Sequence, residues 1–257
     1  MPDLSPATIG ALTLVAFAAG VIDAIAGGGG LLTVPALLAA GLPSHLALAT
    51  NKGQSVFGSF ASMVRYARAG LIDPARARVG FPLGVAGSLA GAALVLAVPP
   101  TTLRPVVLVL LTGAALFIGL RRGQPEARAA AGAPRRHRGS VTAGLVALVL
   151  GAYDGFFGPG TGTFLIVASV ALLGDGLAEA SAGAKVVNFA SNLAALALFA
   201  SRGVVLWRLA LPMAAGQLAG GWLGAHLAVR RGDALVRRVA VVVSLALAAK
   251  VAWDLRG

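Results

Sequence analysis

Two acids and two bases lie inside apolar stretches of this 257-residue sequence, namely Asp23, Lys52, Asp154 and Lys185. A charged side chain at the centre of a membrane helix costs about 2.5–3.5 kcal/mol, so it needs a partner, a wet cavity or a function. Buried lysines could hold an anion, and a buried aspartate could carry a proton. A structural Asp–Lys pair within each half of the chain, or lysines that reach the membrane surface, are the alternatives.

Glycine-rich breaks lie close to both aspartates. Residues 27–30 read GGGG and residues 158–162 read GPGTG, and each break leads into a short apolar segment, 31–40 or 162–173. Unwound backbone is tolerated at membrane depth only where protein or a water-filled cavity surrounds it. A helix that begins there directs free N–H groups and a positive dipole end at the cavity, which suits an anion.

Both lysines share a helix face with small polar side chains. Lys185, Asn188 and Asn192 are three and four residues apart, and Lys52 and Ser55 follow the same spacing. The candidate substrate-binding residues are Gly28, Gly29, Gly30, Asn51, Lys52, Ser55, Gly160, Thr161, Lys185, Asn188 and Asn192, and the candidate proton carriers are Asp23 and Asp154.

Composition excludes most soluble classes. The chain is 58% hydrophobic and 12% charged, with a mean hydropathy of +0.86, whereas soluble domains are about one quarter charged. It has no cysteine and three histidines, so we expect no metal, no cofactor and no catalytic residues. Its net charge of +12 comes from arginines beside apolar runs, which favours membrane topology over nucleic-acid binding.

The apolar runs predict an all-α polytopic membrane protein, because about 20 helical residues cross a bilayer. The expected long spans are 8–26, 47–66, 79–98, 103–120, 140–157, 177–200, 208–229 and 235–253. The segments 31–40 and 162–173 are too short to cross as helices alone, but each could cross together with its extended glycine break.

The two halves of the chain resemble each other. An offset of 131 places Asp23 on Asp154, and an offset of 133 places Lys52 on Lys185. We therefore expect a duplication, with residues 1–120 as the first membrane repeat, 121–139 as a basic cytoplasmic linker and 140–257 as the second repeat.

Arginine positions predict the relative orientation of the repeats. Arginines gather at 65–78 in the first half, in the linker, and at 230–238 in the second half. Cytoplasmic loops collect such residues, and these positions agree if each repeat crosses five times, its short segment included. This predicts two inverted repeats, each of about four long helices plus one short glycine-interrupted half-helix. Eight spans with re-entrant short segments, giving parallel repeats, are the alternative.

Two long motifs suggest a family. The segments GVIDAIAGGGGLLTVPALLAAG with ALATNK, and GAYDGFFGPGTGTFLI with GAKVVNFASN, resemble the signature regions of the TauE/SafE (sulfite exporter) family, in particular its YfcA-like branch. The resemblance covers residues 10 to 254 and implies a bacterial permease built from repeats, some members of which move sulfite or sulfonates. It implies a site at Asp23 to Gly30 with Asn51 and Lys52, and at Asp154 to Gly162 with Lys185 and Asn188.

These features together predict a secondary transporter for a small anion, possibly sulfite, a sulfonate or a related organosulfur compound. It would work by alternating access at a central site between the repeats, in the bacterial inner membrane. The expected partners are this anion and the lipid bilayer, not nucleic acid, and the sequence leaves open whether the chain forms a homo-oligomer. An anion channel with the same cavity is the main alternative, and an intramembrane enzyme using the two aspartates is a weaker one.

Overall fold

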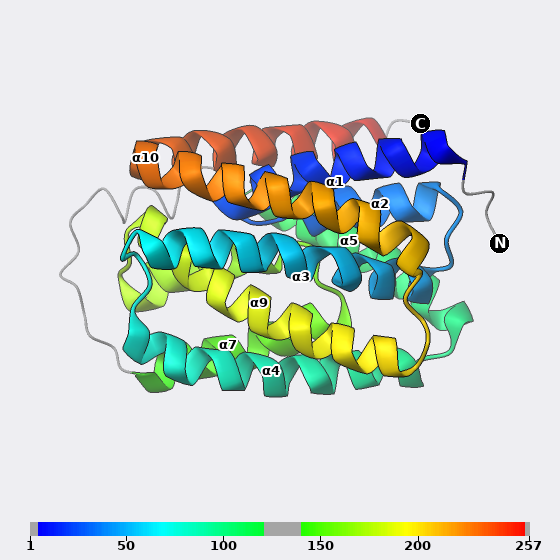
Figure 1. Cartoon of the computed structure of the whole chain (residues 1–257), viewed down its shortest axis with the longest axis horizontal. Coiled ribbons are helices and arrows are strands. Elements are labelled where there is room, and N and C mark those ends of the chain that lie inside the picture. Colours follow the sequence, from blue (N-terminus) through cyan, green and yellow to red (C-terminus); the bar gives the residue numbers. More distant parts are fainter. Residues whose placement is uncertain (1–4, 121–139, 255–257) are drawn as a thin grey trace.

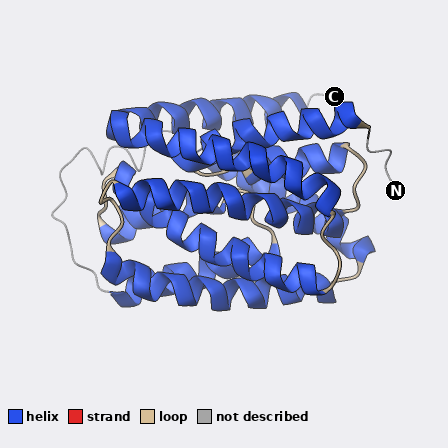
Figure 2. Cartoon of the chain, viewed as in Figure 1, coloured by secondary structure: helices blue, strands red, loops and turns tan. Residues whose placement is uncertain are grey.

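The computed structural model describes residues 5–120 and 140–254, with side chains for 5–118 and 140–243. The predicted linker, 121–139, lies outside the described residues. Every described element is a helix (Figure 2), as the apolar runs predict. The elements are α1 (Pro6–Ala26), α2 (Gly30–Ala39), α3 (Ser44–Arg68), α4 (Pro74–Ala97), α5 (Pro100–Leu120), α7 (Ser140–Phe156), α8 (Thr161–Ala168), the π-helix η1 (Ser169–Leu173), α9 (Leu177–Ser201) and α10 (Trp207–Asp254).

Four of the described helices are long and apolar enough to cross a membrane: α1, α4, residues 100–118 of α5, and α9. Helix α3 is equally long, but the polar run from Thr50 to Ser59 lowers its hydropathy. Helix α10 covers both of the last predicted spans, and Gly232 interrupts it with non-helical backbone, φ 58° and ψ −153°. The long α10 element therefore consists of two helices that meet at Gly232.

The short helix α2 folds back along α1. Leu37 and Leu42, near its far end, pack with Leu12 and Ala16 from the first half of α1. The chain therefore leaves the α1–α2 hairpin at the end of the bundle where α1 began (Figure 1).

Helices α3 and α9 lie side by side in opposite directions at the centre of the bundle (Figure 1). The ring of Phe60 lies 5.3 Å from that of Phe189, and a Cβ on Gly53 would lie 3.8 Å from Leu196. Moving forward along α3 therefore means moving backward along α9. Lys52 is eight residues from the start of α3 and Lys185 eight residues from the start of α9, so the lysines approach the centre from opposite ends.

The most extensive helix packing joins the first half of the chain, residues 5–120, to the second half, residues 140–254. Helix α1 packs along α10, and α4 packs along α7. Glycines make these approaches close, because a Cβ on Gly220 would lie 2.1 Å from the Phe17 carbonyl oxygen and one on Gly87 2.1 Å from that of Leu148. The two halves are thus interleaved and do not form separate bodies.

Candidate functional site

The break between α1 and α2 is formed by backbone that favours glycine. Gly27 and Gly28 have φ values of 76° and 87°, in the left-handed region that costs other residues about 1–2 kcal/mol. This turn brings Gly29 back beside α1, where its N–H donates to the Asp23 carboxylate at 3.2 Å. The second break repeats the pattern, with φ values of 94° at Gly158 and 88° at Gly160.

The two breaks cross in direct backbone contact. A Cβ added to Gly27 would lie 2.2 Å from the Thr163 nitrogen, and one added to Gly30 would lie 3.0 Å from the Cα of Pro159. A side chain at Gly27 would therefore push the second break away. The crossing of the two breaks brings the start of α2 and the start of α8 to one place between α3 and α9.

Hydroxyl groups hold the backbone carbonyls at the end of α1, which the break deprives of helical partners. Tyr66 donates to the Ala24 oxygen at 2.8 Å, Ser181 to that of Ile25 at 2.9 Å, and Thr163 to that of Ala26 at 3.1 Å. These donors come from α3, α9 and α8, so three other helices fix the position of the break. The sequence analysis did not identify any of these donors.

A Tyr66→Phe variant should therefore lose about 1–3 kcal/mol of unfolding free energy, because it leaves the buried Ala24 carbonyl without its donor. Thermal unfolding of the purified protein in detergent would measure this loss. Ser201→Ala is the control, since that exposed hydroxyl bonds only within its own helix end. Equal stability of the two variants would show that Tyr66 does not support the break.

Lys185 pairs with Asp23, across the two halves of the chain. Its ammonium lies 2.7 Å from Asp23 Oδ2, and its side chain is fully buried, whereas that of Asp23 is 25% exposed. The other carboxylate oxygen, Oδ1, accepts the Gly29 N–H. Asp23 thus receives one ammonium and one N–H from the start of a half-helix.

Lys52 pairs with Asp154, and this pair is closed off. The Lys52 ammonium lies 3.0 Å from Asp154 Oδ1 and donates to Asn192 Oδ1 at 3.0 Å. The second oxygen of Asp154 accepts a hydrogen bond from the Ser191 hydroxyl. The side chains of Lys52 and Asp154 are only 2% and 3% exposed. Both lysines are therefore paired with the acid of the opposite half, so the alternatives of a pair within each half and of lysines at the membrane surface are wrong.

The remaining predicted residues surround these pairs to different degrees. Asn51 accepts hydrogen bonds from Thr33 at 2.6 Å and Gln54 at 2.8 Å, and Ser55 accepts one from Gln54 at 3.0 Å. Thr161 donates to the Gly158 carbonyl at 2.8 Å and so serves its own break. Thr33 is a participant that the sequence analysis missed.

Two buried acceptors near the pairs have no hydrogen-bond partner among the residues that the structure describes, Gln54 Oε1 and Asn188 Oδ1. Asn188 Oδ1 and Asp23 Oδ1 each lie 3.3 Å from the point that a Cβ on Gly162 would occupy. Both oxygens therefore lie close to the crossing of the breaks. An unsatisfied buried acceptor is uncommon in proteins, and a water, an ion, a ligand or a second protonation state would satisfy it.

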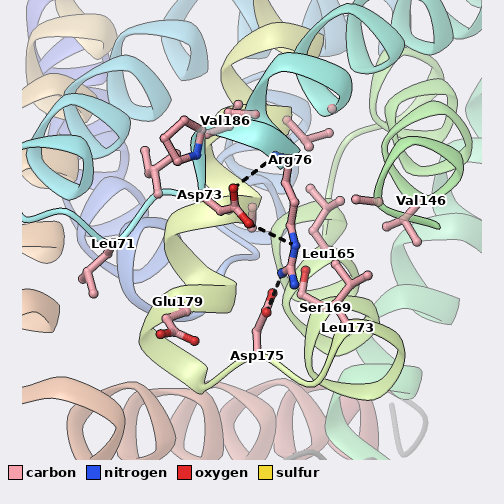
Figure 3. Close-up of a pocket in the computed structure, with 18 of the residues that line it drawn as sticks. Leu71, Asp73, Arg76, Val146, Leu165, Ser169, Leu173, Asp175, Glu179 and Val186 are labelled. Carbon is pink, nitrogen blue, oxygen red and sulfur yellow. Dashed lines mark hydrogen bonds and ion pairs between the residues drawn. The ribbon is translucent and has the colours of Figure 1, made fainter. Parts of the chain in front are cut away.

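A separate cavity of about 400 Å³ opens at the end of the bundle that carries the α3–α4 loop (Figure 3). Arg76 lies in it and bridges Asp73, at 3.4 Å, and Asp175, at 2.5 Å. Burial raises the pKa of Asp175, and the hydrogen bond and charge of Arg76 oppose that rise. The cavity reaches Ala184 on α9 but is not lined by either buried lysine. It joins the two halves of the chain at this end.

The fold and the site define a class of protein: a helical membrane protein with two buried ion pairs where two broken helices cross. A family model described as "Sulfite exporter TauE/SafE" matches residues 12–251. The chain therefore belongs to the sulfite exporter TauE/SafE family, and the predicted resemblance is confirmed.

Similar curated proteins are described as probable membrane transporters. The chain is 39% identical to "Probable membrane transporter protein ORF9" of Sinorhizobium sp., over 99% of this chain and 96% of the relative. It is 38% identical to "Probable membrane transporter protein YfcA" of Escherichia coli strain K12, over 99% and 93%. A Haemophilus influenzae relative described as "Probable membrane transporter protein" is 36% identical, over 98% of this chain and 97% of the relative. No solved structure matches the chain.

Proposed function

We propose that this chain is a secondary transporter for a small anion of the sulfite or sulfonate class, working by alternating access at the crossed breaks. The observation that carries the proposal is the pair of buried ammonium groups, Lys52 and Lys185, beside two half-helix starts. This set of donors suits an oxyanion. The sulfur chemistry rests on the family's description, and the transport role on the descriptions of its relatives.

Two inverted repeats, residues 1–120 and 140–257, provide the two alternating arrangements in this proposal. The support is that contacts recur with the halves exchanged. Gly220 meets the Phe17 carbonyl of α1, while Gly87 meets the Leu148 carbonyl of α7, and each of these residues lies 131 or 133 positions from its counterpart. The Lys–Asp pairs are exchanged in the same way. A two-fold relation between antiparallel halves would produce both sets of contacts.

The basic end of the bundle faces the cytoplasm in this proposal, and the membrane is the bacterial inner membrane. The α3–α4 loop, the start of α9 and the Gly232 interruption lie together, since Arg76 bonds Asp175 and the Ala178 N–H donates to Asp233. Eight described arginines lie at or near this end: Arg65, Arg68, Arg76, Arg78, Arg230, Arg231, Arg237 and Arg238. The opposite end carries Arg104, Arg202 and Arg208. Such an imbalance is typical of cytoplasmic loops.

The anion site of the proposal is the space where the breaks cross. Lys185, Asn188 and Asn192 approach it along α9, and Asp23 or Asp154 would carry a coupling proton. The other proposed binding residues are Gly28, Gly29, Gly30, Asn51, Lys52, Ser55, Gly160 and Thr161. Their common property is a polar group on a break or on the polar face of a central helix.

A Lys185→Ala variant tests the site. Reconstituted into liposomes with an acidic exterior, the parent protein should accumulate labelled sulfite or methanesulfonate above equilibrium, which a channel cannot do. The variant should lose uptake by about 30-fold or more, since removing the partner of a buried charge costs about 2–5 kcal/mol of binding. Arg202→Ala, at an exposed loop, is the control and should transport normally. Unchanged uptake by Lys185→Ala would refute the site.

A further inference from the structure

We propose that Asp23 is an internal competitor of the anion, and that Lys185 binds the anion only when a proton has neutralised Asp23. The Lys52–Asp154 pair is a fixed structural counterpart that keeps its partners throughout. This inference rests on the proposed function, and it narrows that function in three respects: which lysine binds the anion, which aspartate carries the proton, and how many charges the anion carries.

The Asp23 carboxylate occupies the donors that an anion would need. It takes the Lys185 ammonium at 2.7 Å and the Gly29 N–H at 3.2 Å. Those are the cation and the half-helix N–H group expected of an oxyanion site at a broken helix. A bound anion can therefore reach both donors only after the carboxylate has released them. Protonation achieves this, because a neutral carboxyl group holds an ammonium far more weakly.

The two acids differ in their exposure at the surface of the protein. The Asp23 side chain is 25% exposed, which leaves a path for a proton, whereas the Asp154 side chain is 3% exposed. Asp154 is also enclosed by the Ser191 hydroxyl, and its lysine is held by Asn192. Only the Asp23 pair is open to exchange.

This difference is fixed by the sequence. At the offset of 133, the counterparts of Ser191 and Asn192 are Gly58 and Ser59. Glycine offers Asp23 no hydroxyl, and the Ser59 hydroxyl donates to backbone carbonyls of its own helix. If the two halves exchanged conformations during transport, the Asp23 pair would therefore still lack the side-chain partners that enclose the Asp154 pair.

A buried hydrogen-bond acceptor lies near Asp23. Asn188 Oδ1 is buried without a hydrogen-bond partner in the described part of the chain, and it lies near the same point over Gly162 as Asp23 Oδ1. A protonated carboxyl group that turned toward it could donate to it, which would leave the ammonium of Lys185 to the anion. A second protonation state of the site would thus give this unsatisfied acceptor a donor.

The other titratable groups around Asp23 do not take over its role as proton carrier. The helices packed against α1 carry Glu179 and Lys185 on α9, His45, Lys52, Arg65, Tyr66 and Arg68 on α3, and Arg208, His226, Arg230, Arg231, Asp233, Arg237 and Arg238 on α10. Lys52 is engaged by Asp154, Tyr66 donates to the Ala24 carbonyl, and Arg65 donates to His226 at 3.3 Å. Helices α2 and α8 contain no ionisable residue. Asp23 is therefore the exposed acid of the site.

Charge balance then fixes the stoichiometry. The empty site is neutral, with Lys185 positive and Asp23 negative. After one proton and one monovalent anion have bound, the site is neutral again, whereas an anion without the proton would leave an uncompensated buried charge, which is strongly disfavoured. The structure thus assigns the site to a monovalent anion taken together with one proton, in an electroneutral step.

Calorimetric titration of the full-length protein with methanesulfonate tests this inference. In buffers of different ionisation heat, the parent should take up about one proton per anion, and its affinity should therefore fall as the pH rises. Asp23→Asn should bind without proton uptake and without this pH dependence. In liposomes it should exchange the anion but not accumulate it under a proton gradient.

Asp73→Asn, at an acid outside the site whose side chain is 49% exposed, is the control and should retain the proton uptake of the parent. Proton uptake by Asp23→Asn, or its loss in Asp73→Asn, would overturn the assignment of Asp23. If either variant fails to fold, transport by the parent protein still tests the inference. A response of that transport to an imposed membrane potential would refute the electroneutral step. Absence of methanesulfonate and sulfite binding and uptake by the parent would instead refute the proposed function itself.

Discussion

A Gly27→Ala variant should be strongly destabilised. The added Cβ would lie 2.2 Å from the Thr163 nitrogen and 2.3 Å from the Gly162 carbonyl carbon, and both are backbone atoms that cannot rotate away. Overpacking costs about 1–3 kcal/mol and a left-handed alanine about 1–2 kcal/mol, so we expect a loss of about 2–5 kcal/mol. Yield of monodisperse protein and thermal unfolding in detergent would measure it.

Variants of two other glycines separate the cost of overpacking from the cost of the left-handed backbone. Gly70 has φ 71° with no atom near its absent Cβ, so Gly70→Ala carries the backbone strain alone, about 1–2 kcal/mol. Gly10 is helical and open, so Gly10→Ala should stabilise its helix by about 0.5–1 kcal/mol. If Gly27→Ala proved no less stable than Gly70→Ala, the two breaks would not touch as described.

A Lys52→Ala variant should lose about 3–5 kcal/mol of unfolding free energy, because it leaves the Asp154 carboxylate buried without its cation. Removing both charges avoids that penalty. A double variant, Lys52→Met with Asp154→Leu, should therefore be more stable than Lys52→Ala. Chemical or thermal unfolding of the three proteins in one detergent would show the order.

The exposed pair between Arg76 and Asp73 is the comparison for the buried one. Asp73 is 49% exposed in its side chain, and an Asp73→Asn change keeps a residue able to cap α4. It should cost no more than about 1 kcal/mol. A Lys52→Ala protein as stable as Asp73→Asn would mean that water reaches the Lys52–Asp154 pair.

The helices could be predicted closely from the sequence, because an apolar run of membrane length has few other structures available. Predicted spans such as 140–157 and 177–200 agree with α7 and α9 to within one residue. The glycine breaks were also located correctly. The direction of α2 could not be predicted, because it depends on the left-handed backbone at Gly27 and Gly28 and on packing against α1.

The candidate site could be predicted as a set of residues but not as an arrangement. Both lysines are buried, as their apolar surroundings indicated. Their partners could not be deduced, because each Asp–Lys pair joins residues more than a hundred positions apart and depends on how the halves interleave. The difference in exposure between Asp23 and Asp154 arises from tertiary packing and has no signal in the motif around either residue.

Some missed residues did have a signal. Ser181 lies four residues before Lys185, so it extends the polar face of α9, and it donates to the Ile25 carbonyl at the first break. Tyr66 lies 14 residues after Lys52, about four helical turns, and so shares its face of α3. Following each polar stripe over the whole helix would have found both. Thr33 and Thr163 follow the breaks and have no comparable pattern.

The exchange of ion partners has a consequence for biosynthesis. When residues 1–120 have been inserted, Asp23 and Lys52 are both in the membrane, but their partners, Lys185 and Asp154, have not yet been translated. The nascent chain therefore lacks both native ion partners until α7 and α9 arrive, and its hairpin tip lacks the Ser181 and Thr163 donors. We expect the native ion pairs to form only after α9 has been inserted, so a chain truncated before α9 should present its unpaired polar groups to quality-control proteases.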